Sequence, residues 1–296
     1  MFVAPGDPRY PALLGSVASP PGLHVRGEVT VGDALAIAIV GARRASPYGL
    51  EVAERFAFDL AARGVTIVSG LARGIDTAAH RGALAAGGRT IAVLGCGIDV
   101  VYPPENARLM RQIEAQGAVL SQFAPGTPPL AYNFPTRNRT LAALALGVVV
   151  VEAGERSGAL VTAGYAGDLG REVYAVPGRI TSEESRGAHA LLRDGAILVR
   201  TWADVVQELP DMWRSALHAP ENLGSEIGRP SIESEEGRVL ALLRPDEPLH
   251  IEALITRAEL PPARAAAALV GLELGGWARQ LEGQRWVAAT VRGESA

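Results

Sequence analysis

Arginine and glycine residues meet at the ends of apolar segments in the first half of the chain. Three such segments end in glycine, and the first is followed by Arg43 and Arg44. Bare backbone lets a ligand approach closely, and guanidinium groups bind phosphate oxygens through paired N–H donors. A single glycine also serves a tight turn, so it is the repetition at three turns that favours an anion-binding edge. The positions concerned are Gly41, Ser69, Gly70 and Gly95.

A second arginine-rich element opens a predicted helix, and an aromatic residue, Phe134, stands at its start. An aromatic ring beside arginines suits a stacked nucleic-acid base and its phosphate. A lone phenylalanine more often packs in a core, but the polar neighbours of Phe134 favour an exposed ring. The pattern predicts that Phe134, Arg137 and Arg139 of this element contact nucleic acid.

Motifs for nucleotide cofactors are missing from these turns. None has the G-x-G-x-x-G fingerprint of dinucleotide sites or the G-x-x-x-x-G-K-[ST] loop of ATPases, so we expect no cofactor. Asp76 and His80 stand four apart on a predicted helix and could meet, but a structural role is the favoured interpretation. Cys96 is the single cysteine, and no His, Cys or carboxylate set has metal-ligand spacing. We therefore predict no catalytic residue, no metal site and no enzymatic activity.

The overall charge gives no general attraction for nucleic acid. The chain of 296 residues has a net charge of −4, and all 28 of its basic residues are arginine. A DNA-binding role must therefore rest on a local basic patch. The first residues lack the pattern of a signal peptide, and no apolar run approaches the roughly 20 residues that span a bilayer. We expect a cytoplasmic protein without a membrane segment.

The elements that position these residues follow from the apolar pattern. Seven near-continuous apolar runs alternate with amphipathic helical stretches between residues 35 and 209. Strands covered on both faces have this composition, and alternation with helices is typical of a parallel sheet. The sequence predicts an α/β fold with a Rossmann-like, doubly wound, mostly parallel sheet. The runs are Ile37–Val40, Val65–Val68, Thr90–Leu94, Ala118–Leu120, Val148–Val151, Val173–Val176 and Ala196–Val199.

Proline and glycine mark the limits of this domain. Their frequency predicts an extended lead-in over residues 1–34, packed on a Rossmann-like domain of residues 35–209, and a linker over residues 210–232. Residues 233–291 then show three short helical patterns and a hairpin, the order of a winged helix.

The predicted winged-helix domain is acidic. It has nine acidic residues against six arginines, a net charge of −3, and its expected recognition helix contains only Arg264. A reader of the DNA major groove should be basic. We therefore expect a protein contact or an accessory role for this domain.

Six motifs in order along the chain resemble those of the DNA-processing protein DprA (Smf) family. The resemblance spans the whole sheet domain, and the winged helix fits an accessory domain that is frequent in that family. It implies a Rossmann-like dimer that binds single-stranded DNA without sequence preference, protects incoming DNA, and helps to load the RecA recombinase during natural transformation. The motifs are Gly41–Ser46, Ser69–His80, Gly95–Gly97 with Tyr102–Pro103, Phe134–Arg139, Arg156–Ala163 and Ala175–Gly178.

Carried over to this sequence, the resemblance implies roles for single residues. Arg43 becomes the leading phosphate contact, Phe134 a base-stacking residue, and Asn138 part of the pocket wall. Many family members have lysines where this chain has Pro104 and Ala131. The arginines that could compensate are Arg44, Arg137 and Arg139.

The resemblance also implies a two-fold dimer through residues 187–199. Three apolar or aromatic side chains of this segment could form one patch at the last strand of the sheet, although ordinary core packing would explain them equally well. They are His189, Leu192 and Leu198.

Two other classes of function remain open. A nucleotide phosphoribohydrolase of related fold would need a P-G-G-x-G-T loop, to which Ser157–Thr162 is only weakly similar. A protein-interaction scaffold would use the sheet as a frame and the winged helix as its recognition element. Release of free base from nucleotides would distinguish the enzyme from both binding functions.

Overall fold

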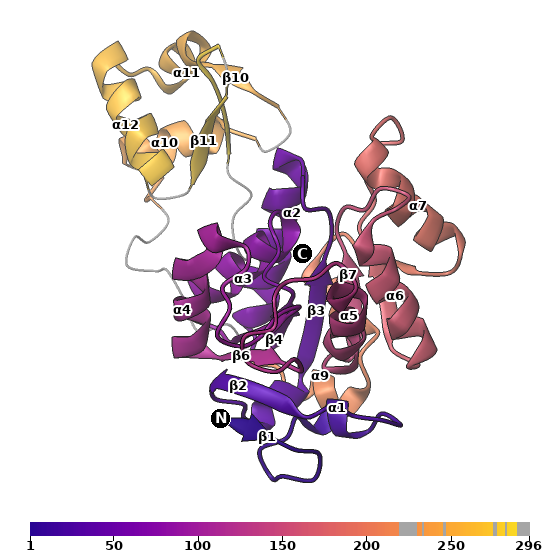
Figure 1. Cartoon of the computed structure of the whole chain (residues 1–296). Helices are drawn as coiled ribbons and strands as arrows, with labels where there is room; N and C mark the ends of the chain where they lie inside the picture. Colours follow the sequence, from indigo (N-terminus) through magenta and orange to yellow (C-terminus); the bar gives the residue numbers. More distant parts are fainter. Residues whose placement is uncertain (219–229, 233, 245–246, 275–276, 282, 289–296) are drawn as a thin grey trace. The chain divides into compact units, whose positions relative to one another are not determined.

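The computed structural model describes residues 1–218, 230–232, 234–244, 247–274, 277–281 and 283–288 (Figure 1). The chain divides into two compact units, Met1–Glu221 and Asn222–Ala296. No described helix is both long and apolar enough to cross a membrane.

Within the described residues, the first unit is built on a sheet with the strand order β1-β2-β6-β5-β4-β3-β7-β8-β9. The strands from β3 to β9 pair in parallel, whereas β1 and β2 pair antiparallel at one edge. The predicted Rossmann-like, mostly parallel sheet is confirmed. The strands are β1 (Phe2–Val3), β2 (Leu23–Gly27), β3 (Ala36–Val40), β4 (Thr66–Ser69), β5 (Thr90–Leu94), β6 (Ala118–Ser121), β7 (Gly147–Val150), β8 (Glu172–Ala175) and β9 (Ile197–Leu198).

Helices cover both faces of this sheet (Figure 1). Along β3, Ala38 and Val40 pack in one core cluster with α5 and α6, while Ile37 and Ile39 pack in another with α2 and α3. Burial of each isoleucine contributes roughly 1.5–3 kcal/mol. The helices are α1 (Ala12–Gly15), α2 (Pro47–Ala61), α3 (Ile75–Ala85), α4 (Ala107–Gln116), α5 (Asn133–Ala143), α6 (Gly158–Asp168), α7 (Arg186–Arg193), α8 (Trp202–Gln207) and α9 (Asp211–Arg214), with 3-10 turns η1 (Val31–Ala34), η2 (Pro104–Asn106) and η3 (Glu183–Ser185).

The order of the strands reverses between β3 and β7. The chain adds β4, β5 and β6 on one side of β3, then returns through α5 to add β7 and β8 on the other side. Where strand order reverses in an open sheet, the loops beyond the carboxyl ends of the strands diverge and leave a crevice.

The first 34 residues contain more regular structure than the sequence indicates. β2 pairs with β6, and Leu23 and Val25 of β2 are buried while His24 and Arg26, which alternate with them, are partly exposed. The strand is five residues long and lies between Pro21 and Glu28, so proline and glycine hide its alternation. Residues 219–229 of the predicted linker lie outside the described residues, whereas its first part forms the short helix α9 (Asp211–Arg214). The predicted domain limits stay predictions.

The second unit has the helix and strand order of a winged helix, as predicted from the sequence. Among its described residues, three strands lie in the order β10-β12-β11 and pair antiparallel. Val239, Leu254 and Leu269 are fully buried at its centre. Its elements are α10 (Glu235–Leu242), β10 (Leu249–His250), α11 (Ile251–Ala258), α12 (Pro262–Leu274), β11 (Ala278–Leu281) and β12 (Arg285–Ala288).

Candidate nucleic-acid interface

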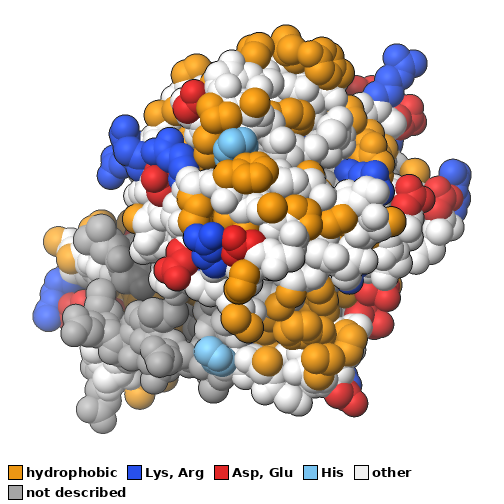
Figure 2. Space-filling view, turned by 60° about the horizontal axis from the view of Figure 1, so that its bottom comes forward, with side chains coloured by type: hydrophobic (Ala, Val, Ile, Leu, Met, Phe, Trp, Pro, Cys, Tyr) orange, Lys and Arg blue, Asp and Glu red, His pale blue; other side chains and the backbone are white. Residues whose placement is uncertain are grey.

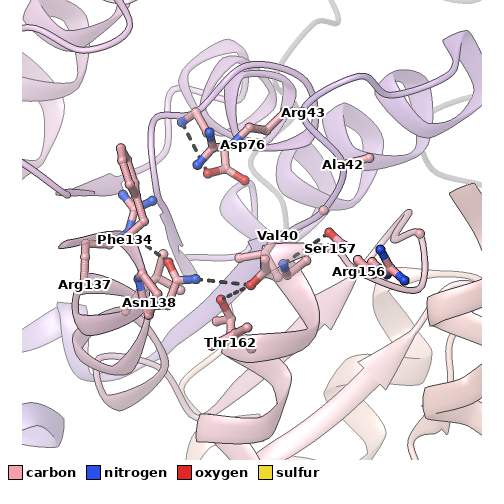
Figure 3. A pocket seen from close by; sticks show the side chains of 18 of the residues that line it. Val40, Ala42, Arg43, Asp76, Phe134, Arg137, Asn138, Arg156, Ser157 and Thr162 are labelled. Carbon is pink, nitrogen blue, oxygen red and sulfur yellow. Dashed lines mark hydrogen bonds between the residues drawn. The ribbon is translucent and has the colours of Figure 1, made fainter. Parts of the chain in front are cut away.

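A pocket of about 490 Å³ lies in the crevice between the carboxyl ends of β3 and β7 (Figure 3). This volume is within the range of about 300–1,000 Å³ that holds small ligands. Its walls come from the loop after β3, from α3 and α5, and from the loop after β7 with the start of α6. Four arginines and two carboxylates make the lining basic. The charged and polar lining residues are Arg43, Arg44, Asp76, Arg137, Asn138, Arg156, Ser157, Thr162 and Glu184.

Arg43 and Phe134 form one wall of this pocket. The guanidinium carbon of exposed Arg43 lies 5.0 Å from the centroid of the half-buried Phe134 ring, within cation–π range. The Tyr102 ring packs beside Phe134 with centroids 5.8 Å apart and an interplanar angle of 51°. Gly95 permits this packing, since a Cβ there would lie 2.8 Å from the Phe134 ring. The ring is therefore held in place before any ligand arrives.

The strand-end glycines leave room for side chains of the protein itself. A Cβ on Gly41 would lie 2.6 Å from Ile75, and one on Gly70 would lie 2.6 Å from a carboxylate oxygen of Asp76. Ser69 is fully buried, and its hydroxyl donates a 2.6 Å hydrogen bond to the Ile39 carbonyl. Gly41 still lines the pocket, but Ser69 is turned into the core.

Arg137 is buried beneath the pocket, with only 4% of its surface exposed. It donates hydrogen bonds to the carbonyls of Gly70 and Val93, and its Nε donates to Asn138 Oδ1 at 3.0 Å. Burial lowers the pKa of Arg137 to about 10, against the opposing attraction of Asp76. The sequence predicts Arg137 as a DNA contact, whereas the structure engages its guanidinium with the ends of β4 and β5.

Asp76 shares this buried floor. One of its carboxylate oxygens accepts hydrogen bonds from the amides of Gly70 at 3.1 Å and Ala72 at 3.3 Å. Burial raises the pKa of Asp76, while the nearby Arg137 charge and these amides act in the opposite direction. Asp76 thus fixes the turn after β4.

His80 does not join Asp76 in a catalytic pair. Its Nδ1 lies 2.7 Å from the Thr90 hydroxyl, which itself donates to the Ile67 carbonyl at 2.7 Å. Because that hydroxyl proton is used, Nδ1 of His80 must carry the hydrogen and donate it. Burial, with a smaller effect of Arg137, lowers the pKa of His80 to about 3. The burial of His80 and its hydrogen bond to Thr90 therefore agree with the structural role that was favoured from the sequence.

The loop after β7 supplies site residues that the sequence interpretation did not select. Arg156 is exposed at the pocket, and the Ser157 hydroxyl caps α6 by accepting from the Ala159 amide at 3.2 Å. Asn138 Nδ2 donates to the Gly158 carbonyl at 3.2 Å and so joins α5 to α6. The sequence did indicate this loop as part of the site, because Ser157, a residue type that caps helices, follows an apolar strand at the same sheet edge as Gly41.

The remaining predicted residues occupy different places. Arg44 is exposed and lines the pocket, whereas Arg139 is exposed on α5 outside it. His189 and Leu192 are half-buried on α7, and His189 Nε2 lies 3.0 Å from the Gly178 carbonyl. Leu198 is 48% exposed on β9, the last strand of the sheet. These last three residues lie apart from the pocket lining.

Two family models match the chain. The model of DNA recombination-mediator protein A matches residues 1–210, and the model of the DprA winged helix domain matches residues 227–284.

Curated proteins of several bacteria are similar over most of the chain. Protein Smf of Escherichia coli (strain K12) is 39% identical over 289 residues, which are 94% of this chain and 75% of that protein. DNA processing protein DprA of Streptococcus pneumoniae is 44% identical over 203 residues, which are 68% of this chain and 72% of that protein. Across the curated relatives, the matches cover between 51% and 75% of their own lengths.

Solved structures agree with this similarity. The X-ray structure of DprA from Streptococcus pneumoniae has a TM-score of 0.68 and 42% identity, and the match covers 71% of this chain and 74% of that one. A structure of DNA processing protein A from Helicobacter pylori, described for its single-stranded DNA binding mode, has a TM-score of 0.62 and 28% identity. It covers 70% of this chain and 94% of that one.

Proposed function

Because this chain belongs to the DNA recombination-mediator protein A family, we propose that its first unit binds single-stranded DNA in the pocket between β3 and β7. The observation that carries this proposal is Arg43 stacked at 5.0 Å on the ring of Phe134 at the mouth of a basic pocket. Such a pair offers a cation to a phosphate and an aromatic face to a base. The single-stranded DNA binding described for the Helicobacter pylori relative supports the same function.

Each pocket residue has a part in this proposal. Arg43, Arg44 and Arg156 contact phosphates, and Phe134 stacks on a base. Gly41 and Asn138 form the wall, and Arg139 lies on α5 where a longer strand would leave the pocket. Arg137, with Gly70 and Ser69, supports the floor without touching DNA. Contacts to phosphates and to a ring face carry no base code, so binding is independent of sequence.

Because the chain belongs to this family, we also propose where the protein acts and which partners it has. We place the protein in the cytoplasm, where it protects incoming single strands and loads the RecA recombinase during natural transformation, without an enzymatic step. A homodimer would bury His189, Leu192 and exposed Leu198 against their own copies at the β9 edge. The acidic winged helix takes a protein partner rather than DNA.

The test is fluorescence anisotropy of the full chain with labelled single-stranded DNA, with duplex of equal length and with nucleotide monophosphates. We expect preference for the single strand and unchanged nucleotides. Equal binding of duplex would overturn the proposal, and release of free base would replace it with a phosphoribohydrolase. Light scattering of a Leu192→Arg, Leu198→Arg variant tests the dimer, which should become a folded monomer.

A further inference from the structure

A buried carboxylate lies behind the loop that carries Arg43 and Arg44. Glu152 lies two residues beyond the end of β7 and is 3% exposed. Its Oε1 accepts a 2.6 Å hydrogen bond from the Ser46 hydroxyl, and its Oε2 accepts a 2.9 Å bond from the Ser46 amide. Both carboxylate oxygens therefore hold the residue at which the loop ends and α2 begins.

The contact between Glu152 and Ser46 also involves the residue that caps the start of α2. The Ser46 hydroxyl that donates to Glu152 also accepts the Gly49 amide at 3.0 Å, which caps the helix. A Cβ at position 49 would lie 2.3 Å from Oε2 of Glu152, so only glycine leaves space for the carboxylate. The loop after β7 and the start of α2 are thus joined by one acidic side chain.

The other end of the loop is fixed independently. The Ile75 amide donates to the Ala42 carbonyl at 3.2 Å. Gly74, at φ +74°, lets the two segments touch, since a Cβ there would lie 2.2 Å from the same carbonyl oxygen. The arginines therefore project from a short loop that is held by α3 at one end and by Glu152 at the other.

We propose that Glu152 is a positioning residue for DNA binding, which holds the Arg43–Arg44 loop in its binding geometry through Ser46. This inference rests on the proposed function. It makes a prediction whose sign is opposite to that of a simple charge effect. Removal of a negative charge near a binding site for a polyanion should strengthen binding, whereas loss of a positioning contact should weaken it.

The first test compares Glu152→Gln with Glu114→Gln, which removes the same charge from α4, where Glu114 pairs with Arg26 at 2.8 Å. We expect Glu152→Gln to weaken binding of a labelled single strand at least fivefold, and Glu114→Gln to change it less than twofold. In an Arg43→Ala, Arg44→Ala background, Glu152→Gln should have less than a twofold effect. Unchanged or stronger binding, or an equal loss in both backgrounds, would overturn the proposal.

A second pair of variants covers the case in which Glu152→Gln does not fold. Ser46→Ala removes the hydroxyl that contacts Glu152 and should weaken binding, while Ser46→Thr retains a hydroxyl and should restore it. Failure of Ser46→Thr to bind better than Ser46→Ala would contradict the positioning role.

Hydrogen exchange of the amides of residues 42–46, without DNA, separates this proposal from the function on which it rests. Faster exchange is expected in Ser46→Ala or in Glu152→Gln, whichever is folded, and unchanged exchange would reject the positioning role even if the chain binds DNA. If the unsubstituted chain bound no single strand while exchange still rose, the proposed function would fail and the loop contact would stand.

Discussion

Two pockets of similar size lie at opposite ends of β3. The pocket at its amino end has about 400 Å³, close to the 490 Å³ of the pocket at its carboxyl end. Two of its three charged lining residues are paired within the protein: Arg9 pairs with Asp7 at 2.7 Å, and Asp33 accepts from Arg89 at 2.9 Å. At the carboxyl end, Arg43, Arg44 and Arg156 have no ion pair within the described ranges.

The face that includes β1, β2 and α1 carries charges of both signs. Figure 2 turns the bottom of Figure 1 forward and shows hydrophobic side chains spread over that surface, with acidic groups near several of the basic ones. The comparison of the two pockets shows that the volume of a pocket does not by itself identify a binding site. What distinguishes the carboxyl end is a set of exposed arginines that form no ion pair within the described residues.

The largest expected effect concerns the support of the carboxyl-end pocket. Arg137→Met should lower the free energy of unfolding by about 3–5 kcal/mol, because it leaves the buried Asp76 carboxylate and two carbonyls without their cation. Denaturant unfolding measures this loss. Arg139→Met, exposed on the same helix, should change stability by about 0.5 kcal/mol or less. Similar losses in both variants would show that Arg137 is not the support.

Charge reversal at the two ends of β3 tests the comparison directly. Arg43→Glu should weaken single-strand binding on the order of 100-fold, since it removes a phosphate partner and adds repulsion. Arg9→Glu makes the same change at the amino end and should stay within about threefold. Arg43→Ala should also reduce the slope of log affinity against log salt by about 0.7. Equal effects at the two ends would break the comparison.

The aromatic wall should contribute without a salt effect. Phe134→Ala should cost about 1–3 kcal/mol of binding free energy while the salt slope stays nearly constant, because a stacked ring neutralises no phosphate. Anisotropy at several salt concentrations measures both quantities. A variant that loses stability but keeps its affinity when folded would assign Phe134 to the core.

Protonation should affect stability away from the pocket. His80 has a pKa of about 3 when folded, and the unperturbed value is about 6.5. The unfolded chain therefore binds a proton between these values that the folded chain rejects. This contribution to stability is complete above pH 6.5 and is lost towards pH 3, at up to about 1.4 kcal/mol per pH unit.

Urea unfolding between pH 7 and pH 4 measures this dependence. His80→Asn should make it shallower, while replacement of the half-buried His24 serves as the control. If the two variants have the same pH profile as the unsubstituted chain, His80 is not the group that titrates.

The smallest effect is expected from the second unit. Arg264, the basic residue of α12, pairs with Glu235 at 2.7 Å, so the helix has little charge to offer DNA. Removal of residues 233–296 should leave single-strand affinity within about threefold. Duplex binding that is present only in the full chain would show that the winged helix reads DNA.

The strands were predictable because burial on both faces demands continuous apolar runs, as in Ile37–Val40. β2 was not predicted, because its alternation from Leu23 to Arg26 is only four residues long and lies within a segment rich in proline and glycine. At the site, Arg43 and Phe134 follow from residue type and from their place at a strand end and a helix start. These arguments place the residues at the pocket, while the contacts with DNA stay predictions.

The burial of Arg137 depends on the phase of α5, which residue type does not reveal. Asn133, Arg137 and Leu141 lie at helical spacing on its buried face, while Arg139 falls on the other side. The strand-end glycines were also only partly interpretable from the sequence. Their spacing predicts bare backbone, but only the three-dimensional structure shows that Ile75, Asp76 and Phe134 fill the space beside them.

The pairing of β3 with β7 sets the time at which this pocket can appear during synthesis. Residues 37–40 pair with residues 147–150, and the wall is complete only when α6 has been made. A nascent chain that ends before β7 leaves one edge of β3 unpaired and open to wrong partners. The growing polypeptide therefore passes through a stage at which its central strand needs shielding and no binding site exists.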